Sequence, residues 1–223
     1  DAVERWLEKK VVKNADRVLT TTKALKEIFA DRYNHEPSVK FLHLPNAIDF
    51  KKFPGGAAEK YGQFTITYLG TLYAGRTPEP VFAAIRNLIT EGKINPSDIR
   101  LRLIGNCGFI EGVLTPEVVK SYGLEAVVEV AEPIPYVDAL KVMRKSHVLL
   151  LLAPELPLQI PAKVYDYMGS GSKILSLSPE KSATTDLINS TGCGMAFNPS
   201  DIAGIGRYIH ELFEGYKHGE LKG

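Results

Sequence analysis

The strongest constraint on the fold is a regular alternation that begins at Phe64. Six short, mostly apolar runs are separated by stretches with helical spacing. The runs read FTITYLG, IRLRLIGN, AVVEV, HVLLLL, KILSLS and GMAF, and the helical stretches start near Pro78, Thr115, Pro135, Pro161, Lys181 and Ser200. Strands that alternate with helices form a parallel sheet with helices on both faces. We therefore expect an α/β fold, a Rossmann-like doubly wound parallel sheet of about six strands, with ligands beyond the carboxyl ends of the strands.

The residues before this alternation follow another pattern. A first helix has an apolar face that needs a partner, formed by Val3, Trp6, Leu7 and Val11. A short strand, RVLTT, precedes a second helix, KALKEIFADRY, for which Thr21 or Thr22 is the N-cap residue. Residues 34–56 then hold three prolines, one short apolar strand near residues 39–44 and little periodicity. This composition is typical of a linker between domains.

The charge and cysteine content exclude several classes of protein. Lys and Arg number 27 and Asp and Glu number 26, so the net charge of +1 gives no electrostatic sign of a nucleic-acid partner. The two cysteines, Cys107 and Cys193, lack metal-ligand spacing, as expected of free thiols in a reducing compartment. The carboxylates also lack metal-ligand spacing, which favours chemistry without a metal ion.

The stretch YLGTLYAGRT follows the first strand and differs from a phosphate-binding P-loop by one residue. Gly70, Gly75, Arg76 and Thr77 match that motif except that Arg replaces Lys. No later strand ends in the magnesium-binding Asp of a P-loop protein, and Pro78 places the helix start after Thr77, which would be the N-cap residue. Two interpretations remain: a glycine turn whose backbone and cation approach an anion, and a plain strand-to-helix turn with a surface Arg.

A second stretch, LQIPAKVYDYMGSGSKILS, opens a helix with a proline and places a cation in its first turn. Lys163 would oppose the helix dipole unless an anion also lies there, and a diphosphate would fit that place. Asp166 follows one turn later and could accept hydrogen bonds from the hydroxyls of a ribose. A surface ion pair between Lys163 and Asp166 is the other interpretation of this spacing.

These motifs resemble a known family. The stretches LPNAIDFKKF, ITYLGTLYAGR, RLRLIGN, PIPYVDALKVMRKSHVLLLL and PAKVYDYMGSGSKIL occur in the order seen in nucleotide-sugar glycosyltransferases of the GT-B fold and look like family 4. In that family an amino-terminal domain holds the acceptor and a carboxy-terminal Rossmann-like domain holds the donor. The resemblance implies that residues 1–50 are the end of the acceptor domain with the interdomain linker, 51–200 the donor domain and 201–223 a carboxy-terminal helix.

The resemblance implies roles for residues around the donor diphosphate. The family usually has an Arg and a Lys after the first strand; Thr71 stands at the Arg position and Arg76 at the Lys position. The stretch PAKVYDY resembles a subgroup in which the Lys of this motif, here Lys163, supplies the replacement cation. Arg76 and Lys163 are therefore the expected catalytic cations, and Gly70, Thr71 and Gly105 are expected to contact the donor.

The resemblance also implies contacts with the nucleoside and the sugar. Asp166 takes the place of the Glu that binds the ribose, whereas Leu158 stands where a second Glu usually touches the transferred sugar. Glu155 and Gln159 are the nearby polar candidates for that contact. The nucleobase is expected near Pro133, Ile134 and Tyr136, although Tyr136 also fits a plain aromatic residue at a helix start.

The function implied is transfer of a sugar, with retention at the anomeric carbon and without a metal ion or resident cofactor, from a nucleoside diphosphate sugar to a glycan or lipid-linked acceptor. The acceptor would be bound by the amino-terminal domain, so this stretch of chain alone is expected not to catalyse the transfer. A cytoplasmic protein, at the inner face of the membrane or free of it, is expected.

The replacement of the family Glu by Leu158 leaves open a non-catalytic nucleotide-sugar-binding or scaffold protein. A nicotinamide-dependent oxidoreductase is disfavoured because G-x-G-x-x-G does not follow the first strand.

Overall fold

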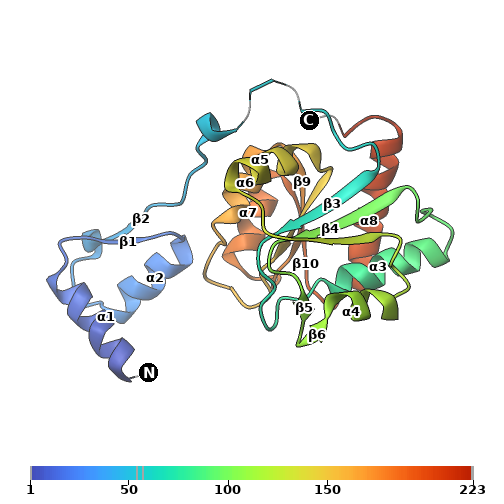
Figure 1. Ribbon diagram of the computed structural model, residues 1–223. Coiled ribbons are helices and arrows are strands. Elements are labelled where there is room, and N and C mark those ends of the chain that lie inside the picture. The colour runs from blue at the N-terminus through green and yellow to red at the C-terminus, as the bar shows by residue number, and fades with distance from the viewer. Residues whose placement is uncertain (1, 54, 57, 222–223) are drawn as a thin grey trace.

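A computed structural model describes residues 2–53, 55–56 and 58–221 of the chain (Figure 1). A small amino-terminal lobe comes first, and a larger sheet domain follows. The lobe consists of α1 (Ala2–Asn14), β1 (Val18–Thr20), α2 (Lys23–Arg32), the 3-10 helix η1 (Ser38–Lys40) and β2 (Phe41–His43). A segment that contains a second 3-10 helix, η2 (Phe50–Lys52), connects the lobe to the sheet domain.

The sheet domain is built on six parallel strands in the order β10-β9-β8-β3-β4-β7. The strands are β3 (Phe64–Leu69), β4 (Ile99–Ile104), β7 (Val128–Ala131), β8 (Val148–Leu152), β9 (Lys173–Leu177) and β10 (Gly194–Phe197). Every neighbouring pair is parallel, so the predicted six-stranded parallel sheet is confirmed. The chain winds from β3 to one edge and then from β8 to the other edge. Such a switch point opens a crevice at the carboxyl ends of the two central strands.

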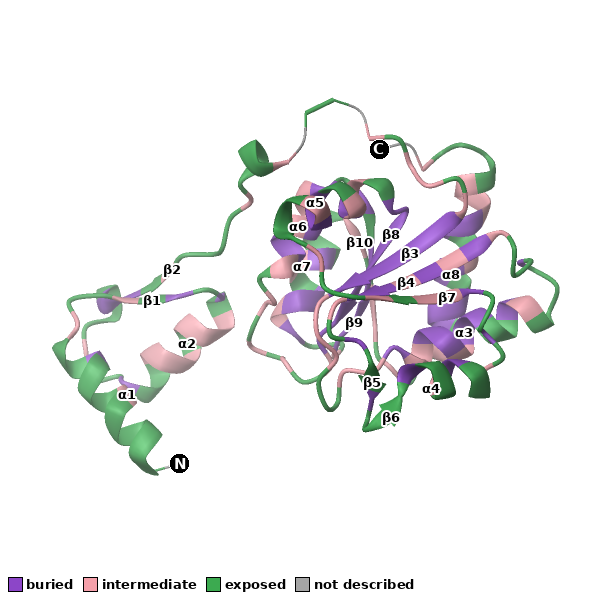
Figure 2. Ribbon diagram, viewed as in Figure 1, coloured by how far each residue is buried: buried purple, intermediate pink, exposed green. Residues whose placement is uncertain are grey.

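Helices cover both faces of this sheet, as the doubly wound prediction requires. Side chains of α3 (Glu79–Thr90), α4 (Thr115–Ser121) and α8 (Ile202–Lys217) share one apolar core with the strands, and those of α5 (Tyr136–Lys145), α6 (Lys163–Gly169) and α7 (Ala183–Thr191) share the other. The central strands β3 and β8 are buried along their whole length (Figure 2). Apolar neighbours on both faces explain why β8 reads as a continuous apolar run, whereas β3 alternates apolar residues with the buried Thr65 and Thr67. A small antiparallel hairpin, β5 (Phe109–Ile110) and β6 (Val113–Leu114), lies between β4 and α4.

The helix starts agree with the sequence at α2 and differ by one residue at α3. The Thr22 hydroxyl accepts the Leu25 N–H at 3.2 Å, so Thr22 is the N-cap of α2. The prediction that Thr77 caps α3 is wrong, because Pro78 is the cap residue and the helix begins at Glu79. The Thr77 hydroxyl still accepts the Glu79 N–H at 3.2 Å, which satisfies one of the free donors at the helix start.

The amino-terminal lobe has a core of its own, in which Val12, Tyr33 and Phe41 are buried together. Its two strands pair in parallel, so β2, which the sequence predicts as part of the linker at residues 34–56, belongs to the lobe. The apolar face predicted for α1 is exposed on the lobe, at Val3, Trp6, Leu7 and Val11. None of the described helices is long and apolar enough to cross a membrane.

The connecting segment packs against the end of α6. A Cβ atom added to Gly169 would lie 2.7 Å from Ile48 Cγ2 and 2.7 Å from Phe53 Cε2, which is closer than real Cβ contacts. Only glycine therefore lets the segment lie this close to the helix. At its far end, the Lys60 ammonium donates to the Ser146 carbonyl at 2.8 Å, just beyond the last turn of α5. These contacts attach the segment to the helices on one face of the sheet.

Candidate functional site

A cavity of about 330 Å³ lies at the switch point of the sheet, beyond the carboxyl ends of β3 and β4. It brings together eight of the residues that the sequence singles out: Gly70, Thr71, Gly105, Pro133, Ile134, Tyr136, Lys163 and Asp166. The other wall residues are Leu69, Ile104, Asn106, Ala139 and Met143, most of them apolar. Convergence of polar groups on an apolar crevice at a switch point is typical of a ligand site in this kind of fold.

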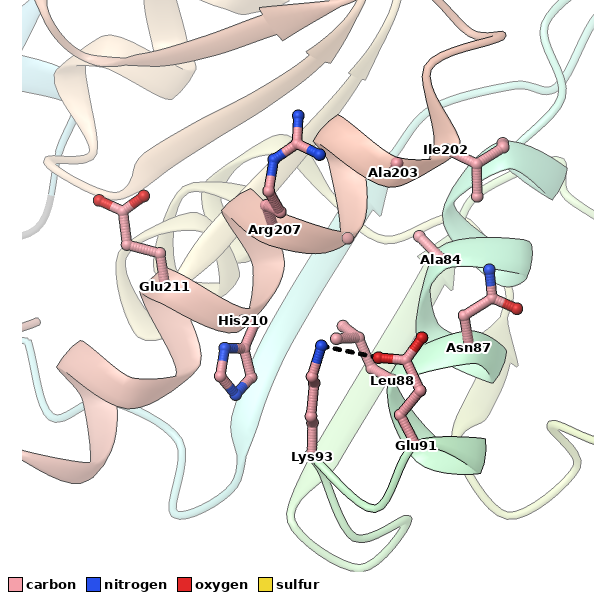
Figure 3. A pocket seen from close by; sticks show the side chains of 11 residues that line it. Ala84, Asn87, Leu88, Glu91, Lys93, Ile202, Ala203, Arg207, His210 and Glu211 are labelled. Carbon is pink, nitrogen blue, oxygen red and sulfur yellow. Dashed lines mark ion pairs between the residues drawn. The ribbon is translucent and has the colours of Figure 1, made fainter.

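Two other hollows are larger, but neither contains a predicted site residue. One, of about 470 Å³, lies between α3 and α8; Figure 3 shows Lys93 paired with Glu91 on its α3 side and Arg207 and His210 on α8. The other, of about 690 Å³, lies beside β4, where Arg102 donates to both carboxylate oxygens of Glu129. Each thus holds a pair of opposite charges, Lys93–Glu91 in one and Arg102–Glu129 in the other, as is common on a solvated surface.

The two strand-end glycines bring backbone segments unusually close together. Gly70 has φ +144° and Gly105 has φ +128°, a region that other residues rarely adopt. A Cβ atom on Gly105 would lie 2.0 Å from the Gly70 carbonyl oxygen, and one on Gly70 would lie 2.5 Å from Lys163 Nζ. Glycine at both positions is therefore needed for the floor of the cavity to form.

Lys163 is the first residue of α6, and its ammonium reaches the end of β3. Lys163 Nζ donates to the Leu69 carbonyl at 2.8 Å and lies 4.6 Å from the centre of the Tyr68 ring. Burial, and secondarily the charge of Arg76, lower the pKa of Lys163 to about 8. The Leu69 carbonyl and the Tyr68 ring carry no net charge, so nothing in these contacts neutralises the ammonium. An anion in the cavity would stabilise the charged form of Lys163.

Arg76 lies on the loop between β3 and α3 and does not line the cavity. Its guanidinium carbon is 5.4 Å from the centre of the Tyr73 ring. It is nevertheless close enough to Lys163 for its charge to lower the pKa of that residue. Two cations that approach one another at the rim of a cavity repel, and an anion bound between them removes that repulsion.

Asp166 and Tyr136 are joined by a hydrogen bond across the cavity. The Tyr136 hydroxyl donates to Asp166 Oδ1 at 3.0 Å. Lys163 donates to a carbonyl instead, so the surface ion pair with Asp166 is not the arrangement that forms. The Tyr136 hydroxyl holds the carboxylate in place and leaves it further lone pairs for a ligand hydroxyl. Since these two residues are 30 positions apart, no local pattern in the sequence signals the contact.

The two candidates for the sugar contact, Glu155 and Gln159, and Leu158, which replaces the family Glu, lie outside the cavity lining, on the loop between β8 and α6. Two consecutive carbonyls of this loop are held by hydroxyls: Leu158 O accepts from Thr22 Oγ1 at 2.7 Å and Gln159 O accepts from Thr184 Oγ1 at 3.2 Å. The Gln159 and Glu155 side chains are exposed. The Glu155 carboxylate lies against Gly75, where a Cβ atom would come within 2.6 Å of it.

The described part of the chain has no group of three or more His, Cys, Asp or Glu side chains that could hold a metal ion. Cys107 is buried, and burial raises the pKa of its thiol to about 11. Its Sγ lies 3.4 Å from the Gly70 carbonyl oxygen, below the floor of the cavity. The cavity offers the Lys163 ammonium, the Asp166 carboxylate and backbone groups, a set suited to an anionic ligand that also carries hydroxyls.

No protein-family model and no curated protein matches this chain. Several solved structures share its fold. Anabaena HepE in complex with UDP has a TM-score of 0.69 at 13% identity, over 95% of this chain and 57% of HepE. Sucrose-phosphate synthase from Thermosynechococcus elongatus has a TM-score of 0.66 at 16% identity, over 99% of this chain and 55% of that enzyme. The lipopolysaccharide outer core galactosyltransferase WaaB has a TM-score of 0.63 at 16% identity, over 91% of this chain and 54% of WaaB.

The chain shares the fold of a little over half of each of these three proteins. HepE has also been solved with UDP-glucose. At these identities the likeness concerns the fold, and what the chain binds has to be argued from its own residues.

Proposed function

We propose that this chain is the donor-binding part of a glycosyltransferase of the GT-B fold, of the family 4 type. It would transfer a sugar from a nucleoside diphosphate sugar to a glycan or lipid-linked acceptor. The observation that carries the proposal is the convergence of Lys163 and the Tyr136–Asp166 pair on one switch-point cavity, with Arg76 near enough for its charge to act on Lys163. The shared fold with transferases, one of them solved with UDP and UDP-glucose, supports it.

The nucleoside would occupy the apolar end of the cavity. Asp166 would accept hydrogen bonds from the ribose hydroxyls, with its carboxylate oriented by Tyr136. The base would lie beside the loop that follows β7, against Pro133 and Ile134. This arrangement gives one end of the ligand an apolar contact surface and the other end a cationic one.

The diphosphate would lie over the glycine floor between the two cations. Gly70, Thr71 and Gly105 would approach it through their backbone. As the bond to the sugar breaks, negative charge grows on the leaving diphosphate, and Lys163 and Arg76 would stabilise that charge. This leaving-group stabilisation needs no metal ion, and we propose retention at the anomeric carbon. Glu155 or Gln159, on the β8–α6 loop, would contact the sugar.

The proposal also assigns a role to each part of the chain. Residues 1–50 would complete the acceptor domain and the linker, 51–200 would bind the donor, and 201–223 would close the chain with a helix. The acceptor would be held by the amino-terminal domain, and the protein would act in the cytoplasm, at the inner face of the membrane or free of it. By itself this stretch of chain would bind the donor without turning it over.

Titration of nucleotides tests the proposal. Nucleoside mono-, di- and triphosphates would be titrated into the protein by calorimetry, with and without a chelator. We expect the diphosphate and the diphosphate sugar to bind best, with no effect of the chelator. A magnesium-dependent preference for the triphosphate would reject the proposal in favour of a P-loop-like site. A non-catalytic protein is the second candidate, because Leu158 replaces the family Glu; donor hydrolysis by the full-length protein separates the two.

A further inference from the structure

A short hairpin beside the proposed site carries an unusual backbone conformation. Glu111 and Gly112 form the turn between β5 and β6, with φ of +47° and +82°. Turns of this kind favour Gly, Asn or Asp, and Glu111 is the one non-glycine residue in the described chain with a positive φ. A Glu in this conformation raises the question of what its side chain does.

The Glu111 carboxylate binds the loop that carries Arg76. Glu111 Oε1 accepts the Gly75 N–H at 2.7 Å, a short, charge-assisted hydrogen bond between segments 36 residues apart. Gly75 is the third residue of a tight turn, residues 73–76, closed by the Arg76 N–H on the Tyr73 carbonyl at 2.9 Å. This turn is named the Arg76 turn below. The turn itself does not use the N–H of its third residue, which is therefore free for an outside acceptor.

Both ends of this contact are firmly placed. In the hairpin, Ile110 is buried in the core, and the Thr115 N–H donates to the Gly108 carbonyl at 2.9 Å across its base. In the Arg76 turn, Gly75 has φ +79°, and the Leu72 N–H just before it donates to the Asn106 carbonyl at 3.1 Å. The hairpin can therefore fix the position of the turn.

The contact orients Arg76 without neutralising it. An acid that served to balance Arg76 would pair with the guanidinium, but Glu111 binds the backbone N–H of the preceding residue. The guanidinium lies over the Tyr73 ring, and its charge acts on Lys163. The positive charge at the rim of the cavity is kept, while the turn that carries it is fixed.

We propose that Glu111 is a positioning residue for the donor diphosphate: its hydrogen bond to Gly75 holds the Arg76 turn so that Arg76 meets the outer phosphate. This inference rests on the proposed function. Glu111 touches no ligand itself and acts through Arg76. Its effect should therefore appear with a diphosphate, be absent with a monophosphate, and vanish once Arg76 is removed.

The first measurement needs no ligand. Amide hydrogen exchange at Gly75 is compared in the wild type, Glu111→Ala, Glu111→Gln and Glu125→Ala. Glu125 is an exposed carboxylate before β7, so its variant changes the net charge equally. We expect faster exchange at Gly75 in Glu111→Ala only, because Gln keeps an acceptor oxygen. Unchanged exchange in Glu111→Ala would overturn the proposal whatever the protein binds.

The second measurement is a double-mutant cycle read by calorimetry. The probes are the mono- and diphosphates of adenosine, guanosine, cytidine and uridine, and the pair that binds the wild type best is used. We expect Glu111→Ala to weaken diphosphate binding about tenfold and to leave the monophosphate unchanged, with Glu111→Gln close to wild type. In an Arg76→Ala background, Glu111→Ala should cause no further loss.

The outcomes separate the two proposals. Additive losses in the cycle, or equal losses for the mono- and diphosphate, would overturn the positioning role while the proposed function stands. A wild type that binds none of the diphosphates would reject the proposed function and with it the role in diphosphate binding, and the exchange result would still decide whether Glu111 holds the turn.

Discussion

The pH dependence of nucleotide binding should report the charge of Lys163. Burial and the nearby Arg76 lower the pKa of Lys163 to about 8 in the free protein. A bound diphosphate would favour the charged ammonium and raise that pKa again. Between the two pKa values the complex binds more protons than the free protein, so affinity falls as the pH rises through that window. Well below about pH 8 the ammonium is charged in both the free protein and the complex, so it does not make the affinity depend on pH there.

The size of the effect follows from the fraction of Lys163 that is charged in the free protein. With a pKa of about 8, that fraction falls about 30-fold between about pH 7 and about pH 9.5, which corresponds to a loss of about 2 kcal/mol in binding free energy. Cys107 and Tyr68, which lie beside Lys163, do not titrate in this window, because burial raises the pKa of Cys107 to about 11 and raises that of Tyr68 further.

The assay is calorimetry of diphosphate binding across this range in buffers of different ionisation enthalpy. Near pH 8 the wild type should take up about half a proton per diphosphate bound. Lys163→Arg is the control, because it keeps a cation whose charge does not change in this range. Proton uptake that persists in Lys163→Arg, or a wild-type affinity that is flat from about pH 7 to about pH 9.5, would refute the assignment of Lys163 to the diphosphate.

Three further predictions concern single side chains. Asp166→Asn should weaken nucleoside diphosphate binding by about 1 to 3 kcal/mol without unfolding the protein. Asp138→Asn, whose half-exposed carboxylate pairs with Lys141 outside the cavity lining, should have no effect on binding. Unaltered affinity of Asp166→Asn by calorimetry would remove Asp166 from the ribose contact. Arg76→Ala should cost the diphosphate about 1.5 to 3 kcal/mol more than the monophosphate, and equal losses for both would reject only the role of Arg76. Gly105→Ala should lower the free energy of unfolding by about 1 to 3 kcal/mol, because its Cβ atom would collide with the Gly70 carbonyl. Gly108→Ala, in the same β4–β5 loop but with open space around the added Cβ, should be near neutral. Urea titration of the two variants measures both free energies of unfolding.

The fold was predictable because the parallel sheet leaves a periodic record in the sequence. A strand covered on both faces is rich in apolar and β-branched residues, and its crossover helix is amphipathic, so β3 and β8 stand out as short runs of such residues between helical stretches. The candidate site was predictable for a related reason. Gly70 and Gly105 end two neighbouring strands, and the carboxyl ends of parallel strands meet at one edge of the sheet.

The contacts that organise the site were not predictable from the sequence. The Tyr136–Asp166 and Gly75–Glu111 hydrogen bonds join segments 30 and 36 residues apart. The first depends on where α5 and α6 lie relative to one another, the second on where two turns lie, and neither produces a local spacing. The prediction of Thr77 as the α3 cap failed for a different reason: the local signal was present, but Pro78 is the cap residue, and the Thr77 hydroxyl accepts the Glu79 N–H.

The position of Lys163 suggests how a site of this type works without the usual Arg after the first strand. Thr71 stands at that position, and its hydroxyl accepts from Asn106 Nδ2 at 3.3 Å, so it supplies no charge. Lys163 reaches the same strand end from α6, through its hydrogen bond to the Leu69 carbonyl. Under the proposed function, the two cations then approach the diphosphate from different elements, the β3–α3 loop and α6. A cation that reaches across the cavity must be partly buried, and burial is the main cause of its lowered pKa. The replacement therefore carries a consequence that an exposed Arg would not: the donor should bind less well once the pH exceeds about 8.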